Sequence, residues 1–72
     1  MSNTTSLSIV LNGTPETLEN VATVTDLLAH LGYLGKRVAV ELNGQIVPRS
    51  NHEHTQLNNG DQLEIVVAVG GG

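Results

Sequence analysis

The 72-residue sequence contains no cysteine, phenylalanine or tryptophan, and it has a single tyrosine. The absence of cysteine excludes disulfide bonds, thiolate metal ligands and a cysteine nucleophile in this chain. With so few aromatic residues, the core has to be built from valine, leucine and isoleucine. A chain of this length forms one small domain with a modest core, which leaves little volume for a deep catalytic pocket. A carrier, adaptor or subunit is therefore expected, not an enzyme.

Basic residues are also scarce, since three lysines and arginines stand against seven acidic residues and the net charge is −4. Nucleic-acid affinity comes mainly from basic side chains on phosphates, so no nucleic-acid partner is expected. A protein partner with a positive surface is favoured instead. No apolar run approaches the roughly 20 residues that cross a bilayer, and the N-terminus lacks the features of a signal peptide. We expect a cytoplasmic protein with no membrane association, monomeric when alone.

Alternating apolar and polar residues predict strands, and two Asn-Gly pairs between them predict tight hairpin turns. Asn12-Gly13 joins the first two expected strands, and Asn43-Gly44 joins the next two. Pro15 cannot donate to a β-ladder, so its strand should lie at an edge of the sheet. The expected strands are 6–11, 14–19, 36–42, 45–48 and 62–69.

One helix is predicted over residues 23–32. Thr23 is suited to cap its start, and Asp26 three residues later completes a capping box. Gly32 supplies the left-handed residue that ends it. A single apolar stripe follows from the spacing of Val24, Leu27, Leu28 and Leu31. His30 lies near the helix end, where its ring suits the negative end of the dipole. So short a helix is marginal by itself and has to pack on a sheet.

The expected order is thus β-β-α-β-β-β, with two hairpins around one helix and the last strand between the hairpins. This arrangement is the α+β fold called β-grasp or ubiquitin-like, a mixed sheet of four to five strands packed on one main helix. We expect a disordered extension over residues 1–5, the β-grasp domain over 6–69 and a flexible glycine tail over 70–72.

The polar stretch at residues 50–59 contains the sequence His-Glu-His. His52 and His54 would lie on the same side of an extended segment, and two imidazoles can begin a metal site. A zinc site needs three or four ligands, however, and the spacing fits no zinc motif. A solvated surface connection is the favoured interpretation, and no metal site is expected.

The sequence ends in three glycines directly after the last expected strand. A trimmed flexible terminus is one interpretation, because terminal disorder is common. The other is a reactive terminus, in which the carboxylate of Gly72 attacks the α-phosphate of ATP inside a partner enzyme. Without Cβ atoms, Gly70, Gly71 and Gly72 can thread a narrow channel, and four extended residues reach roughly 13 Å. No side chain is expected to be catalytic.

The last strand should turn Leu63, Ile65 and Val67 toward the helix and leave an apolar outer face. Clustered apolar residues on a solvent-facing surface are typical of interaction sites, although ordinary strand composition is the alternative. The residues expected to dock a partner are Ala39, Val66, Ala68 and Val69.

Three stretches, "TVTDLL", "VAVELNGQIVPRS" and "LNNGDQLEIVVAVGGG", resemble the ThiS family of sulfur carriers in bacterial thiamine biosynthesis. The resemblance covers nearly the whole chain from residue 7. It implies that an E1-like adenylyltransferase of the ThiF type uses ATP and Mg²⁺ to convert the Gly72 carboxylate to an acyl-adenylate. Sulfur from a cysteine desulfurase then yields a C-terminal thiocarboxylate, which supplies a thiazole synthase of the ThiG type. No cofactor is expected to bind this chain stably.

Three alternatives stay open beside that resemblance. The small subunit of molybdopterin synthase uses the same sulfur chemistry, but such chains tend to be longer and to have more aromatic residues. A ubiquitin-like modifier would end as an isopeptide on a lysine. A plain interaction module would leave its tail idle.

Overall fold

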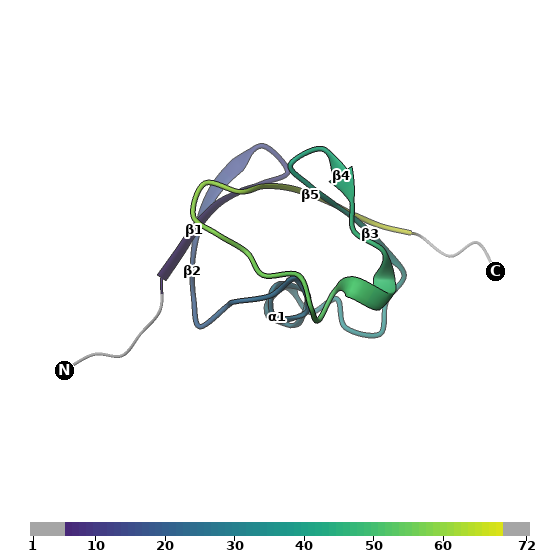
Figure 1. The fold of residues 1–72 in the computed structure, drawn as a ribbon. Coiled ribbons are helices and arrows are strands. Elements are labelled where there is room, and N and C mark those ends of the chain that lie inside the picture. The colour runs from purple at the N-terminus through teal and green to yellow at the C-terminus, as the bar shows by residue number, and fades with distance from the viewer. Residues whose placement is uncertain (1–5, 69–72) are drawn as a thin grey trace.

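The computed structural model describes residues 6–68, which fold as five strands around one α-helix (Figure 1). The predicted extension at 1–5 and the predicted tail at 70–72 lie outside the described residues. The expected α+β, β-grasp arrangement is confirmed, with one sheet in the order β2-β1-β5-β3-β4. The elements are β1 (Ser6–Leu11), β2 (Thr14–Glu19), α1 (Val24–Leu31), β3 (Val38–Leu42), β4 (Gln45–Ile46), the 3₁₀ helix η1 (Arg49–Asn51) and β5 (Gln62–Val67).

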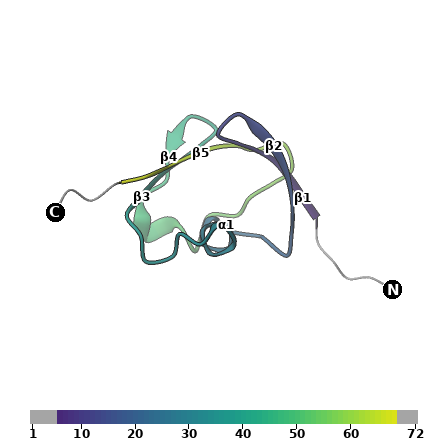
Figure 2. The same cartoon turned by 180° about the vertical axis from the view of Figure 1, so that it is seen from behind.

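Strand β5 lies in the middle of the sheet between the two hairpins, as the sequence predicts. It runs parallel to β1 and antiparallel to β3, while each hairpin pairs its own strands antiparallel. Strand β2 forms one edge, so Pro15 costs no ladder hydrogen bond on its outer side. The sheet arches over α1, which covers its concave face in both views (Figures 1 and 2).

Both hairpin turns have the positive φ angles that Asn-Gly turns favour, with φ of 50° at Asn12 and 51° at Asn43. Each asparagine also holds β5 through its side chain. Asn12 Oδ1 accepts from the Ile65 N–H at 2.9 Å, and Asn43 Oδ1 accepts from the Gln62 N–H at 2.9 Å. The two turns therefore close their own hairpins and fix the central strand between them.

Helix α1 begins and ends where the sequence predicts. The Thr23 hydroxyl accepts from the Asp26 N–H at 3.1 Å, and the Asp26 carboxylate accepts from the Thr23 N–H at 3.1 Å, which is a capping box. A further hydrogen bond from the Ala22 N–H, the largest cause, together with that from Thr23 lowers the pKa of Asp26 below its ordinary value. At the other end Gly32 takes the left-handed conformation, with φ of 79°.

The core is entirely aliphatic, as the composition requires. Leu27 and Val24 on α1 are fully buried against Leu63 and Val40 from the two neighbouring strands β5 and β3. Leu31, the last member of the predicted stripe, packs against this core only partly buried. The remaining core residues are Leu7, Ile9, Leu18, Val21, Leu28, Leu57 and Ile65.

The segment after β4 differs from the expected surface connection. The strand expected over 45–48 ends at Ile46, and η1 follows it. The polar chain then crosses the start of α1, where the Val24 N–H donates to the Thr55 carbonyl at 3.0 Å and the Thr25 N–H donates to the His52 carbonyl at 3.1 Å. These bonds satisfy helix N–H groups that have no partner inside a helix. The helices within residues 6–68 have at most 8 residues, which is far short of the roughly 20 that a membrane-spanning helix needs.

Candidate functional site

The end of β5 is the last described part of the chain and leads toward the predicted tail. The Ala68 N–H donates to the Arg37 carbonyl at 2.8 Å, one position beyond the register pair Val38–Val67. The chain is thus held to β3 up to Ala68. The end of β5 is paired with β3 alone, because its pairing with β1 covers only Gln62 and Leu63. Val69, predicted to dock a partner, and the three tail glycines lie outside the described residues.

The outward face of the sheet carries the other residues predicted to dock. Ala39 and Val66 are register partners on β3 and β5, so their side chains share one face. Val66 is 64% exposed, and both Ala39 and Ala68 are exposed. The alternation along β5 is as predicted, since Leu63 and Ile65 are buried. The structure therefore brings the three described docking candidates together on the solvent side.

Ile46 extends this apolar surface, and the sequence reasoning missed it. It lies opposite Glu41 in the β3–β4 pair, on the same outward face, and it is 65% exposed. The signal was available in the sequence, because the Asn43-Gly44 turn fixes the register that places Ile46 across from Glu41. We call Ala39, Ile46, Val66 and Ala68 the outward patch.

Two carboxylates lie next to the outward patch. Glu41 and Glu64 are direct register partners on β3 and β5, and the same pairing turns both side chains outward. Like charges directly opposite one another on a sheet are destabilising. This pair therefore places negative charge beside the outward patch, and the repulsion lowers the stability of the sheet. Negative charge at that position suits a partner with a positive surface.

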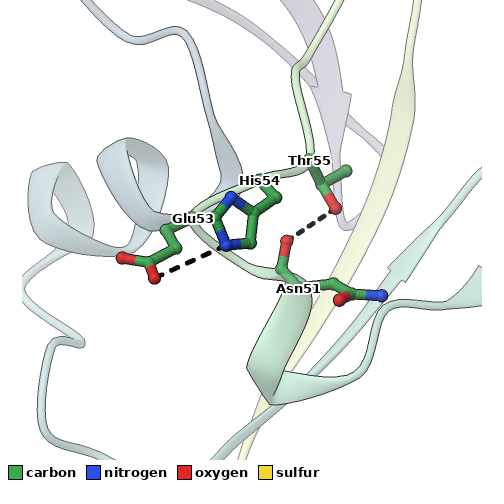
Figure 3. Close-up of polar contacts among 4 residues, drawn as sticks. All are labelled: Asn51, Glu53, His54 and Thr55. Atoms are coloured by element: carbon green, nitrogen blue, oxygen red, sulfur yellow. Dashed lines mark hydrogen bonds and ion pairs between the residues drawn. The ribbon is translucent and has the colours of Figure 1, made fainter.

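The two histidines do not form a site, and the expectation for their placement was wrong. His52 and His54 do not share a side of an extended segment, because the chain turns there: His52 is buried at 7% exposure, with its Nε2 3.2 Å from the Val47 carbonyl oxygen. His54 points to solvent, with Nε2 3.7 Å from Glu53 Oε1 (Figure 3).

The turn around the histidines is held by Thr55, whose hydroxyl donates to the Asn51 carbonyl at 2.8 Å (Figure 3). Among the described residues, no group of three or more His, Cys, Asp or Glu side chains is placed to hold a metal ion. His52 thus has a structural role in the fold. Of the two, only His54 is exposed to solvent, as was expected of both histidines.

Comparison with known proteins finds some relatives that are much longer than this chain and others of similar length. The profile of the ThiS family matches residues 9–72. A thiazole synthase of Paramagnetospirillum magneticum is 42% identical over 66 residues, which are 92% of this chain but 20% of that protein. The chain thus spans about a fifth of the length of this relative. An uncharacterised protein, ycf40, of Pyropia yezoensis is 39% identical over 92% of this chain and 93% of its own length.

The fold has a solved counterpart as well. The crystal structure of a thiamine biosynthesis protein (ThiS) from Geobacter metallireducens superposes with a TM-score of 0.76 at 33% sequence identity, covering 92% of this chain and 100% of that one. The solution structure of that Geobacter protein gives a TM-score of 0.75. A family match over most of the chain and a shared β-grasp fold show that this chain belongs to the ThiS family of sulfur carriers.

Proposed function

We propose that this protein carries sulfur for thiazole formation in thiamine biosynthesis as a thiocarboxylate at Gly72. The observation that supports this most directly is the family match, which extends through residue 72 and so includes the three glycines. Strand β5 supplies an ordered base for them, since it is paired with β3 up to Val67 and the Ala68 N–H donates to the Arg37 carbonyl. The proposal needs no catalytic side chain in this chain.

The chemistry follows from the poor reactivity of a carboxylate. One oxygen of the Gly72 carboxylate attacks the α-phosphorus of ATP, the bond to pyrophosphate breaks, and an acyl-adenylate forms. A sulfur nucleophile then attacks the acyl carbon, and AMP leaves with the electrons of the broken carbon–oxygen bond. ATP and Mg²⁺ belong to the partner, an E1-like adenylyltransferase of the ThiF type. A cysteine desulfurase is the source of sulfur as a persulfide, and a thiol supplies the two electrons that leave the sulfur on the acyl carbon as a thiocarboxylate.

A thiazole synthase of the ThiG type is the proposed acceptor of the sulfur. Two relatives named thiazole synthase, from Paramagnetospirillum magneticum and Magnetococcus marinus, match this chain over a fifth of their lengths at 42% and 39% identity. A ThiS-like segment within such proteins supports the idea that carrier and synthase work together. We further propose the outward patch, continued by Val69, as the surface that docks these partners, because exposed apolar residues gather there next to β5.

Intact-mass spectrometry tests the carrier role. The purified chain is incubated with an E1-like adenylyltransferase, ATP, Mg²⁺ and sulfide, and we expect a mass increase equal to the replacement of one oxygen by sulfur. Fragmentation should place the change at Gly72. A chain lacking Gly71 and Gly72 is the control and should stay unmodified. The proposal is wrong if the full chain also stays unmodified beside an active partner, or if it forms lysine-linked conjugates of higher mass instead.

A further inference from the structure

All the lysine and arginine residues of this chain lie around one concavity. The chain has three such residues, and Lys36, Arg37 and Arg49 all line a hollow of about 270 Å³. Two segments form its sides, the loop between α1 and β3 and the region of η1. Both lie on the side of the molecule where β5 ends (Figures 1 and 2). We call this concavity the basic hollow.

The lining of the basic hollow is apolar as well as charged. Leu28, Tyr33, Leu34 and Val38 contribute to it. Leu34 is 57% exposed and is one of three exposed large apolar side chains among the described residues. The other two, Ile46 and Val66, belong to the outward patch. An apolar lining ringed by cations matches a peptide segment with an apolar anchor and acidic neighbours better than it matches a small inorganic anion.

No acidic side chain within residues 6–68 forms an ion pair with the cations of the basic hollow. Across residues 6–68, the only side-chain ion pair joins His54 to Glu53. Glu53 is also the only acidic residue that lines the hollow. The remaining acidic residues are not part of the lining: Glu16, Glu19, Asp26, Glu41, Asp61 and Glu64. A molecule of net charge −4 therefore carries one locally positive site.

The basic hollow is next to Ala68, the last described residue of the chain. Arg37, which lines it, accepts the hydrogen bond from the Ala68 N–H through its backbone carbonyl at 2.8 Å. Val38, also in the lining, pairs with Val67. Any enzyme that receives the residues after Ala68 must bring part of its own surface close to these cations.

We propose that the basic hollow binds an acidic segment, with an apolar anchor side chain, of the enzyme that adenylates Gly72. This inference rests on the proposed function. An enzyme that binds ATP needs positive potential around its nucleotide, and that potential repels cations near the entering tail. An acidic segment at the rim of the active site would compensate for this repulsion and would guide the carrier in the right orientation.

The test measures adenylation kinetics with carrier variants. The neutralised variant carries Lys36→Gln, Arg37→Gln and Arg49→Gln. We expect its KM as a substrate to rise by about tenfold with little change in kcat, because rim charges act mainly on the encounter. The KM of the native chain should also rise when ionic strength increases from about 0.01 M to about 0.15 M, since the Debye length falls from about 30 Å to about 8 Å. The neutralised variant should lose most of this dependence.

A matched control separates the local site from net charge. It has the same total change in charge, made at exposed positions away from the hollow: Thr14→Glu, Thr17→Glu and Gln45→Glu. We expect it to keep the native KM, and thermal unfolding checks that both variants are folded. The inference is overturned if the neutralised variant keeps the native KM, if the control changes equally, or if only sulfur transfer to the synthase is affected. If the native chain is not adenylated, the proposed function itself fails.

Discussion

Strand β5 offers a direct test of the division between core and docking surface, because Leu63 and Val66 face opposite sides of one strand. Leu63 is 1% exposed and lies between Leu11 on β1 and Leu42 on β3 in the sheet register. Truncating a buried leucine to alanine removes its transfer free energy and leaves a cavity, which together cost about 2–5 kcal/mol. A domain of 72 residues has a total stability of about 4–11 kcal/mol. Leu63→Ala should therefore remove a large part of the free energy of unfolding.

Val66 is 64% exposed, so Val66→Ala should change the free energy of unfolding by no more than about 0.5 kcal/mol. Urea denaturation followed by circular dichroism measures both variants, with the m-value checked for two-state behaviour. The adenylation assay is the second readout. Val66→Asp places a charge in the outward patch, and we expect it to raise KM for the adenylyltransferase while the fold stays intact.

Two results would refute this reasoning. A loss below about 1 kcal/mol for Leu63→Ala would mean that the core under β5 does not support the sheet as its burial implies. Unchanged adenylation of a folded Val66→Asp variant would show that the outward patch is not the docking surface. The first result concerns stability alone and the second concerns binding alone, so each can fail independently.

Two further predictions concern charges outside the core. Asp26→Asn should lower the thermal midpoint at neutral pH. Hydrogen bonds from Ala22 and Thr23 lower the pKa of Asp26 in the folded state. The stability that the Asp26 carboxylate contributes is therefore present above its ordinary pKa of about 3.8 and is lost as the pH falls through the folded pKa. The difference in thermal midpoint between Asp26→Asn and the native chain should therefore shrink in acid. A difference in midpoint that is independent of pH would contradict this expectation. Glu64→Gln removes the repulsion from Glu41 and should stabilise the fold by about 0.2–1 kcal/mol in urea denaturation at low salt. Glu16→Gln is the control, since Ile9 lies opposite it; equal effects of both variants would argue against the pair.

Much of the fold is encoded in local patterns that act over a few residues. The capping box at Thr23 and Asp26, the left-handed Gly32 and the two Asn-Gly turns are short-range effects of backbone geometry, and the structure confirms each of them. The place of β5 between the hairpins was also predictable, because only a central strand lets two hairpins bury one helical stripe. Membership in a family of sulfur carriers confirms the expectation that the chain is not an enzyme.

Other features depend on contacts between distant parts of the chain. His52 is polar and lies in a polar stretch, yet it is buried because the segment after η1 crosses the start of α1. The carbonyls of that segment accept hydrogen bonds from N–H groups in the first turn of the helix. The hydrogen bonds by which the side chains of Asn12 and Asn43 hold β5 also join residues that are far apart in the sequence. No local pattern contains that information, because the bonded residues are 19 and 53 positions apart in the sequence.

Local sequence patterns are sufficient to predict an aliphatic β-grasp core, the ends of its helix and the outward alternation along β5, because propensities and periodicity act over a few residues. Only the folded structure shows that Lys36, Arg37 and Arg49 surround one hollow beside the end of β5. Charge and exposure become properties of a surface only when folding brings separate loops together. A pattern read along one dimension cannot show which side chains will share that surface.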